Sequence, residues 1–238
     1  MKTLGVIGGL GPMATAFFMQ MVIEMTSSGT DQEHIEMLIH NCPSIPDRTS
    51  YILGTSKEDP SIPMIQIGRR LAENGAQVIA IPCITANYFF KQMEQAIPVP
   101  IINIIEETAE YLVKNQIHSV GLMATDGTVQ SALFQNTLQE HGIRVILPDE
   151  EGQQDVMHLI YENVKATKPV EMNRFNRVSD DLRSRGADVI ILGCTELSMI
   201  RRDEKIGPGY LDAMQLLAMR AVETCGKLKE EYRCLITR

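Results

Sequence analysis

The sequence predicts an α/β fold made of two pseudo-symmetric lobes, each with a mostly parallel sheet flanked by helices. Strand-like and helix-like segments alternate along the chain, which is typical of parallel sheets covered by helices on both faces. In addition, the stretch GAQVIAIPCIT at 75–85 recurs as GADVIILGCTE at 186–196, at a constant offset of 111 residues. This duplication favours two related lobes with a site in the cleft between them, rather than one continuous sheet.

Each copy of the repeat has the same internal order. A Gly-Ala turn leads into an apolar run rich in β-branched residues, and a cysteine followed by a polar pair closes it. That order is typical of a buried parallel strand ending in a functional loop. A looser repeat aligns LGVIGGLGPMATAFF at 4–18 with VGLMATDGTVQSALF at 120–134, at an offset of 116 residues. Each half therefore begins with strand, glycine turn and helix, and later returns to strand, cysteine and helix.

In the first half, short β-branched or alternating runs predict strands, and helical spacing of apolar residues predicts helices. The expected strands are 3–9, 34–40, 77–82 and 98–104, and the expected helices are 13–26, 63–74 and 86–96. The segment 41–62 is polar, contains prolines and has no clear period. Long irregular segments inside compact domains are often functional loops.

The same criteria apply to the second half. The expected strands are 118–125, 143–148 and 188–193, and the expected helices are 106–115, 128–141, 152–165 and 170–185. A closing helix is expected at 213–231, after the turn PGYLD. We expect this helix to pack back on the first lobe. The first lobe would then comprise residues 1–100 and 209–238, and the second residues 101–208.

Charge and composition restrict the class of protein. The net charge of −8 argues against nucleic-acid or anionic-membrane partners, which attract clustered Lys and Arg. No apolar run is long enough for a transmembrane helix, and the N-terminal MKTLGVIGG predicts no signal peptide. The five cysteines are odd in number and include no C-x-x-C pair, which argues against a disulfide framework and favours the cytoplasm. The five histidines show no zinc-ligand spacing with the cysteines, so no metal is expected.

The repeated cysteines, Cys83 and Cys194, are the strongest candidates for chemistry. Each is expected at the carboxyl end of a strand, the edge where α/β sheets bind ligands. A helix begins just after each one, and its N-terminus favours a thiolate. Thr85 and Thr195 are well placed to cap these helices. A single cysteine is often just a small buried hydrophobe, but two at equivalent positions of a repeat indicate a shared function.

Proton transfer is the chemistry that uses both thiols. Covalent catalysis would need a neighbouring base such as histidine, and a disulfide is a poor default in the cytoplasm. In proton transfer, a thiolate removes a proton from a carbon and a thiol on the opposite face returns one, which inverts the centre. Of the other cysteines, Cys225 and Cys234 are expected to be structural, and Cys42 stays open.

Four motifs carry a family resemblance: GGLGPMAT at 8–15, PCITAN at 82–87, MATDGT at 123–128 and LGCTEL at 192–197. With them, essentially the whole chain resembles the cofactor-independent aspartate/glutamate racemases, and the aspartate racemase branch in particular. The resemblance implies two α/β lobes with the active site between them. It further implies inversion of an amino acid's α-carbon by two cysteines without pyridoxal phosphate, and a homodimer.

The resemblance also assigns roles to residues. Cys83 and Cys194 would be the two acid/base groups. Arg48 would hold a substrate carboxylate, a task suited to its planar, bidentate guanidinium, and Lys165 would reach the site from the second lobe. By themselves these two cations would be interpreted as surface charges. The remaining positions that would line the pocket or contact the substrate are Leu10, Ile84, Thr85, Thr125, Thr128, Thr195 and Glu196.

Two residues depart from the family pattern P-C-N-T-x-H. Ile84 replaces the asparagine, whose amide would reach a substrate carboxylate, and Asn87 replaces the histidine. The substrate therefore stays open between aspartate, glutamate and another amino acid. A related lyase or isomerase of small acids, or a two-lobed binding module with structural cysteines, remain alternatives. A nucleotide site is disfavoured, because GGLGP is not G-x-G-x-x-G and lacks the acidic residue of that fingerprint.

Overall fold

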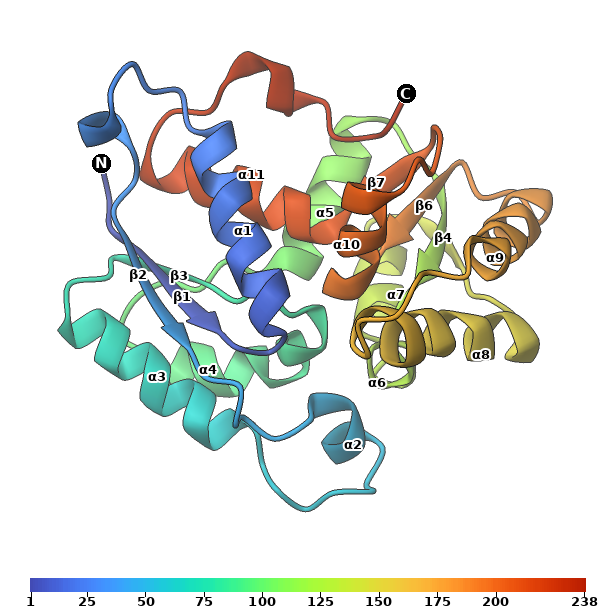
Figure 1. The fold of residues 1–238 in the computed structure, drawn as a ribbon, viewed down its shortest axis with the longest axis horizontal. Helices are drawn as coiled ribbons and strands as arrows, with labels where there is room; N and C mark the ends of the chain where they lie inside the picture. The colour runs from blue at the N-terminus through green and yellow to red at the C-terminus, as the bar shows by residue number, and fades with distance from the viewer.

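The computed structural model describes residues 1–238 and contains one parallel sheet in each half of the chain (Figure 1). The first sheet has the order β2-β1-β3, with β1 at Leu4–Gly8, β2 at Met37–Asn41 and β3 at Val78–Ala80. The second has the order β5-β4-β6-β7, with β4 at Ser119–Met123, β5 at Arg144–Ile146, β6 at Val189–Leu192 and β7 at Tyr210–Asp212. All neighbouring strands pair in parallel. The predicted α/β fold with two sheets is confirmed.

Helices cover both sheets. In the first half they are α1 (Pro12–Met25), α2 (Arg48–Ile52), α3 (Ser61–Glu73) and α4 (Phe90–Ala96), with short 3-10 helices η1 (Asp31–Glu33) and η2 (Ile84–Phe89). The second half contributes α5 (Ile104–Lys114), α6 (Asp126–Gln130), α7 (Leu133–Glu140), α8 (Glu150–His158), α9 (Met172–Ser184), α10 (Thr195–Asp203) and α11 (Ala213–Cys225). A π-helical turn, η3 (Leu159–Val164), continues α8, and a 3-10 turn, η4 (Glu230–Arg233), lies near the C-terminus.

The central strands are buried on both faces, and side chains on opposite faces of a strand pack into different hydrophobic clusters. In β1, Leu4 and Val6 join a cluster with side chains of α1 and α11, whereas Ile7 joins a second cluster with α3 and α4. In β4, Val120 joins the first cluster and Met123 joins a third one, with α8 and α9. The continuous apolar runs of the sequence therefore reflect two-sided burial.

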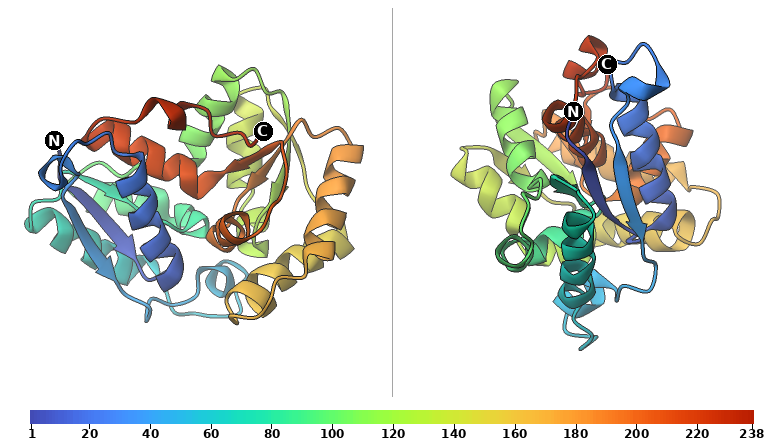
Figure 2. Two further views of the ribbon diagram at one scale, coloured as in Figure 1. Left: turned by 45° about the horizontal axis from the view of Figure 1, so that its top comes forward. Right: turned by 90° about the vertical axis from the view of Figure 1, so that its left-hand side faces the viewer.

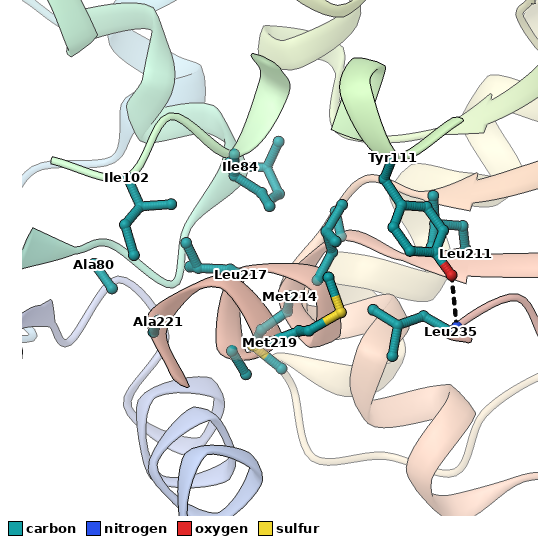
Figure 3. Packing of buried hydrophobic residues seen from close by; sticks show 14 of the residues in the cluster. Ala80, Ile84, Ile102, Tyr111, Leu211, Met214, Leu217, Met219, Ala221 and Leu235 are labelled. Atoms are coloured by element: carbon teal, nitrogen blue, oxygen red, sulfur yellow. Dashed lines mark hydrogen bonds between the residues drawn. The ribbon is translucent and has the colours of Figure 1, made fainter. Parts of the chain in front are cut away.

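The largest core is shared by the two halves. Its 37 buried residues come from both sheets and from α1, α5 and α11. Helices α5 and α11 lie between the two sheets in Figure 1, and the left view of Figure 2 shows α11 in the same place. In Figure 3, Ala80 and Ile84 of the first half lie close to Leu217 of α11. The Tyr111 hydroxyl of α5 accepts a 2.7 Å hydrogen bond from the backbone N–H of Leu235, which fixes the C-terminal segment on the same core.

The strand expected at 98–104 is wrong. Only Ile101 bridges to β3, and the prolines at 98 and 100 have no N–H to donate to a sheet ladder. The side chain of Asn103 then accepts hydrogen bonds from two backbone N–H groups and starts α5. The apolar segment therefore does not form a strand, because its prolines lack N–H donors and Asn103 starts a helix.

Three further differences concern a divided helix, an earlier helix end and an additional strand. The helix expected at 128–141 is two helices, α6 and α7, because Ala132 between them takes a left-handed conformation with φ 54°. The closing helix ends at Cys225, with Gly226 as its C-cap, instead of reaching residue 231. The turn PGYLD contains a short strand, β7, which pairs with β6 of the second sheet. The lobe boundaries expected at 100 and 209 stay a proposal.

Replacing Leu217 with alanine should lower the free energy of unfolding by about 2–5 kcal/mol, because the side chain is fully buried in the shared core. Urea denaturation measures the change. The matched control is Val113→Ala on α5, where the side chain is 49% exposed and the loss should stay within about 0.5 kcal/mol. Equal losses in the two variants would show that the core shared by the lobes does not hold the fold together.

Candidate active site between the lobes

Each repeated cysteine lies between a strand and a helix. Cys83 precedes η2 with φ −159° and ψ 110°, and Cys194 precedes α10 with φ −144° and ψ 140°. Both residues are buried and both occupy the N-cap position. The expectation that Thr85 and Thr195 cap these helices is wrong, because each threonine lies inside the helix that follows its cysteine. The extended cysteine itself therefore ends the strand and starts the helix.

The two thiols face the same small space. This space, called the gap here, has a volume of about 10 Å³ and is lined by residues of both lobes. A cavity of that size holds at most about one water molecule. Its lining residues are Leu10, Asp47, Arg48, Thr49, Cys83, Ile84, Thr85, Thr125, Tyr161, Lys165, Cys194, Thr195 and Glu196. Segments far apart in the sequence thus meet at the carboxyl ends of the two sheets.

Cys194 is held as a thiol by its neighbour. Its Sγ donates a hydrogen bond of 2.9 Å to Oε2 of Glu196, which also accepts one of 3.1 Å from the Thr195 hydroxyl. Burial raises the pKa of Cys194 well above its usual value, and the charge of Glu196 raises it further, while Lys165 acts in the opposite direction. A buried thiolate beside a carboxylate is unfavourable, so the proton stays on sulfur.

Arg48, at the start of α2, is 8% exposed and ties three segments together. Nη2 donates to the carbonyl of Leu10 at 2.8 Å, and Nη1 donates to the carbonyls of Pro46 and Ile45 at 3.0 and 3.4 Å. A guanidinium has five N–H donors, so two remain, and one of them belongs to the buried, unpartnered Nε. Burial disfavours the charge of the guanidinium, but the neighbouring Cys83 and Asp47 outweigh this effect and raise the pKa of Arg48.

Lys165 enters the site from the second lobe. It directly follows the π-helical turn η3, a rare widened turn that is frequent at functional sites. Its Nζ lies 4.1 Å from the centroid of the Tyr161 ring. Burial opposes the charge of the ammonium group, but Glu196, Tyr161 and the two cysteines outweigh this effect and raise the pKa of Lys165. The gap therefore has one cation from each lobe, the buried Arg48 and the more exposed Lys165.

Three threonine hydroxyls join the lobes beside the gap. The Oγ1 atoms of Thr85, Thr125 and Thr128 lie 3.1 Å from one another. Thr125 is also the N-cap of α6, where it accepts from the backbone N–H of Thr128. Thr85 comes from the first lobe and the other two come from the second. We call this group the hydroxyl seam.

The structure thus brings every candidate residue to one place. Ten of them line the gap, and Thr128 adjoins it through the hydroxyl seam. Ile84 lines the gap and is also part of the shared core. Asn87 turns away, because its amide donates to the Ile84 carbonyl at 3.0 Å. The cysteines outside the repeat, Cys42, Cys225 and Cys234, do not line the gap, and burial raises the pKa of Cys225 to about 11.

Sequence reasoning missed three residues that line the gap: Asp47, Thr49 and Tyr161. A signal existed for Asp47, since Asp directly before a helix is a favoured N-cap, and its carboxylate accepts from the N–H of Ser50 at 2.8 Å. That cap sets the start of α2 and with it the place of Arg48. Thr49 and Tyr161 have no pattern in the sequence that separates them from ordinary helical residues.

A larger cavity adjoins the gap. This outer cavity has a volume of about 650 Å³ and lies between the turn after β1, the segment before α2, the segment 164–170 and α10. Leu10, Asp47, Arg48, Lys165 and Glu196 line both spaces. The side chains that close the gap are therefore also the floor of the outer cavity.

Comparison with known proteins identifies the family. A model of the Asp/Glu/hydantoin racemase family matches residues 7–221. The chain belongs to this family. Among its relatives is the broad specificity amino-acid racemase RacX of Bacillus subtilis (strain 168), which is 28% identical over 232 residues, or 93% of this chain and 97% of the relative. Family membership confirms the predicted enzyme class, a cofactor-independent amino-acid racemase.

Solved structures of racemases superpose on the whole molecule. The aspartate racemase of Picrophilus torridus has a TM-score of 0.86 and 30% identity, with 98% of each chain covered. An aspartate racemase homologue from Pyrococcus horikoshii OT3 has a TM-score of 0.75 and 24% identity, with 94% of this chain and 99% of the other covered. The second likeness concerns the fold alone. In the present chain, no helix has both the length and the apolar character needed to cross a membrane.

Replacing Glu196 with glutamine should lower the pKa of Cys194. The variant removes the negative charge that disfavours the thiolate, while the amide oxygen can still accept the thiol proton. The pH dependence of Cys194 alkylation, followed by mass spectrometry of its peptide, measures the shift. Glu204→Gln, at an exposed position just after α10, is the matched control. An unchanged profile in Glu196→Gln would mean that the carboxylate does not control the protonation of this thiol.

Proposed function

We propose that this racemase inverts the α-carbon of a small acidic amino acid, aspartate or glutamate, with Cys83 and Cys194 as the two acid/base groups. The observation that carries the proposal is the pair of repeated cysteines lining one gap from opposite lobes. A centre held between two such groups can lose a proton on one face and gain one on the other. The proton leaves on one sulfur and arrives from the other, so the enzyme ends with the two protonation states exchanged.

The neighbours of the two cysteines support different roles, with Cys194 as the proton donor and Cys83 as the proton acceptor. Cys194 carries a proton that is hydrogen-bonded to Glu196, so it is ready to donate. Cys83 lies beside the guanidinium of Arg48, a cation that would stabilise negative charge forming on that sulfur. One thiol and one thiolate are what the first half-reaction needs. In the other direction the two groups would act in reversed roles.

The lining residues supply partners for a bound amino acid. The two donors left on Arg48 fit a carboxylate, and Lys165 offers a second cation for the side-chain carboxylate of an acidic substrate. The hydroxyls of Thr85, Thr125, Thr128 and Thr195 and the adjacent backbone of Leu10 would orient the α-carboxylate. Negative charge that develops there when the α-proton leaves would be stabilised by these groups. Ile84 provides no hydrogen bond, so its part is to shape the gap.

The finer points are proposals of the same kind. The aspartate racemase of Picrophilus torridus supports aspartate, and the broad-specificity relative supports a wider range of substrates. We propose a homodimer, by analogy with the family, and a cytoplasmic protein, because all five cysteines are free.

The test is exchange of the α-hydrogen in deuterated water. With L-aspartate or L-glutamate and no added cofactor, the protein should incorporate α-deuterium and form the D-enantiomer, as followed by NMR and chiral chromatography. Cys83→Ser and Cys194→Ser should each lower the rate by about 10²–10⁴-fold, because a serine hydroxyl is a poor acid and base near neutral pH.

The control for these variants is Cys234→Ser, at an exposed cysteine outside the gap, which should exchange like the unmodified protein. Circular dichroism of all three variants verifies that they fold. Absence of exchange with every amino acid tested, or full activity in folded Cys83→Ser and Cys194→Ser, would contradict the proposal.

A further inference from the structure

We propose that the outer cavity binds the side chain of the substrate, and that this side chain is longer than that of aspartate, apolar along its length and anionic at its end, as in 2-aminoadipate. The inference rests on the proposed function, because it requires the α-carbon to lie between Cys83 and Cys194. It adds a site for the part of the substrate that does not react.

The volumes indicate where a side chain must go. The gap measures about 10 Å³ and the outer cavity about 650 Å³. Small-molecule sites typically measure about 300–1,000 Å³, so the second space alone has the size of a ligand pocket. Since Leu10, Arg48, Lys165 and Glu196 line both spaces, a side chain that leaves the gap past them enters the outer cavity. The carboxylate of aspartate, one methylene from the α-carbon, would end near this boundary and leave the cavity unused.

The walls of the outer cavity favour methylene groups. Met13 and Ala14 come from the first lobe, and Val164, Val170 and Met199 come from the second, so both lobes contribute apolar residues to the lining. Burial of one methylene group corresponds to about fourfold in affinity. The two methylenes that 2-aminoadipate has beyond aspartate should therefore raise kcat/KM by about fifteenfold.

The charges of the outer cavity favour an anionic end. The carboxylate of Asp203 is already paired, because Arg202 donates hydrogen bonds to both of its oxygens at 2.6 and 2.7 Å. Glu196 accepts from Cys194 and Thr195. The cation left without an ion pair at the outer wall is Lys168, which lines the cavity. Asp47, at the floor of the cavity, accepts from the Ser50 N–H and lies beside the cations Arg48 and Lys165. An acidic end group could pair with the Lys168 ammonium, whereas a lysine-like or arginine-like side chain would meet Arg48, Lys165 and Lys168 as like charges.

A panel of substrates tests the inference with the full-length protein. Initial rates of α-deuterium incorporation at low concentration give kcat/KM for L-aspartate, L-2-aminoadipate, L-norleucine and L-lysine. We expect kcat/KM for 2-aminoadipate to exceed that for aspartate by about fifteenfold. Norleucine should fall below 2-aminoadipate because it lacks the anionic end, and lysine should be the poorest substrate.

Two variants test the role of Lys168. Lys168→Glu should lower kcat/KM for 2-aminoadipate by more than tenfold and for aspartate by less than threefold, while Lys168→Met should lie between that variant and the unmodified protein. Lys205→Glu makes the same charge change at an exposed position outside the cavity and should leave both values unaltered.

The outcomes separate the two proposals. Exchange that is faster with aspartate than with 2-aminoadipate would overturn the side-chain subsite and leave the proposed racemase function intact. Equal rates with norleucine and 2-aminoadipate, or a Lys168→Glu variant that behaves like Lys205→Glu, would overturn the anionic end group. Absence of exchange with every amino acid would refute the proposed function and the subsite with it.

Discussion

The arrangement of the site depends on one constraint, the apolar core that the two lobes share. Thirty-seven buried residues, from both sheets and from the helices between them, fix how the sheets lie relative to one another. Parallel strands deliver the residues after them to one edge, so the position of each sheet decides where its cysteine lies. Tyr111 and Leu217 therefore influence the gap without touching it, because they hold the helices that separate the sheets.

The two halves share the same backbone arrangement at their cysteines but differ in the charged groups around them. In each half an extended cysteine ends a strand and starts a helix. The first half places this cysteine near a buried arginine, and the second gives it a carboxylate two residues later as a hydrogen-bond acceptor. The two cysteines therefore have equivalent backbone positions but different charged neighbours. Two-base inversion needs one proton donor and one proton acceptor at the start, and the proposed roles follow this difference.

The sequence alone predicted six of the seven strands and the position of both cysteines, because buried parallel strands leave apolar runs and the repeat marks their ends. It missed the short strand β7. It was insufficient where short-range chemistry decides. Two prolines prevent the apolar segment 98–104 from forming a strand. The left-handed backbone of Ala132 divides a segment whose apolar spacing predicts one continuous helix. Within the site, Arg48 and Lys165 came from family resemblance, while Tyr161 reaches the gap only through the tertiary packing of a π-helical turn. No periodicity encodes such a contact.

The hydroxyl seam has a consequence for how the site can receive a carboxylate. Each hydroxyl has one donor and two acceptor positions, so Thr85 can exchange its partners across the seam for water oxygens or for a carboxylate. The net contribution of a neutral hydrogen bond is only about 0.5–1.5 kcal/mol. Breaking one of these hydrogen bonds therefore costs little compared with disturbing the shared core, and a hydroxyl of the seam can turn toward a carboxylate while the core keeps the sheets in place.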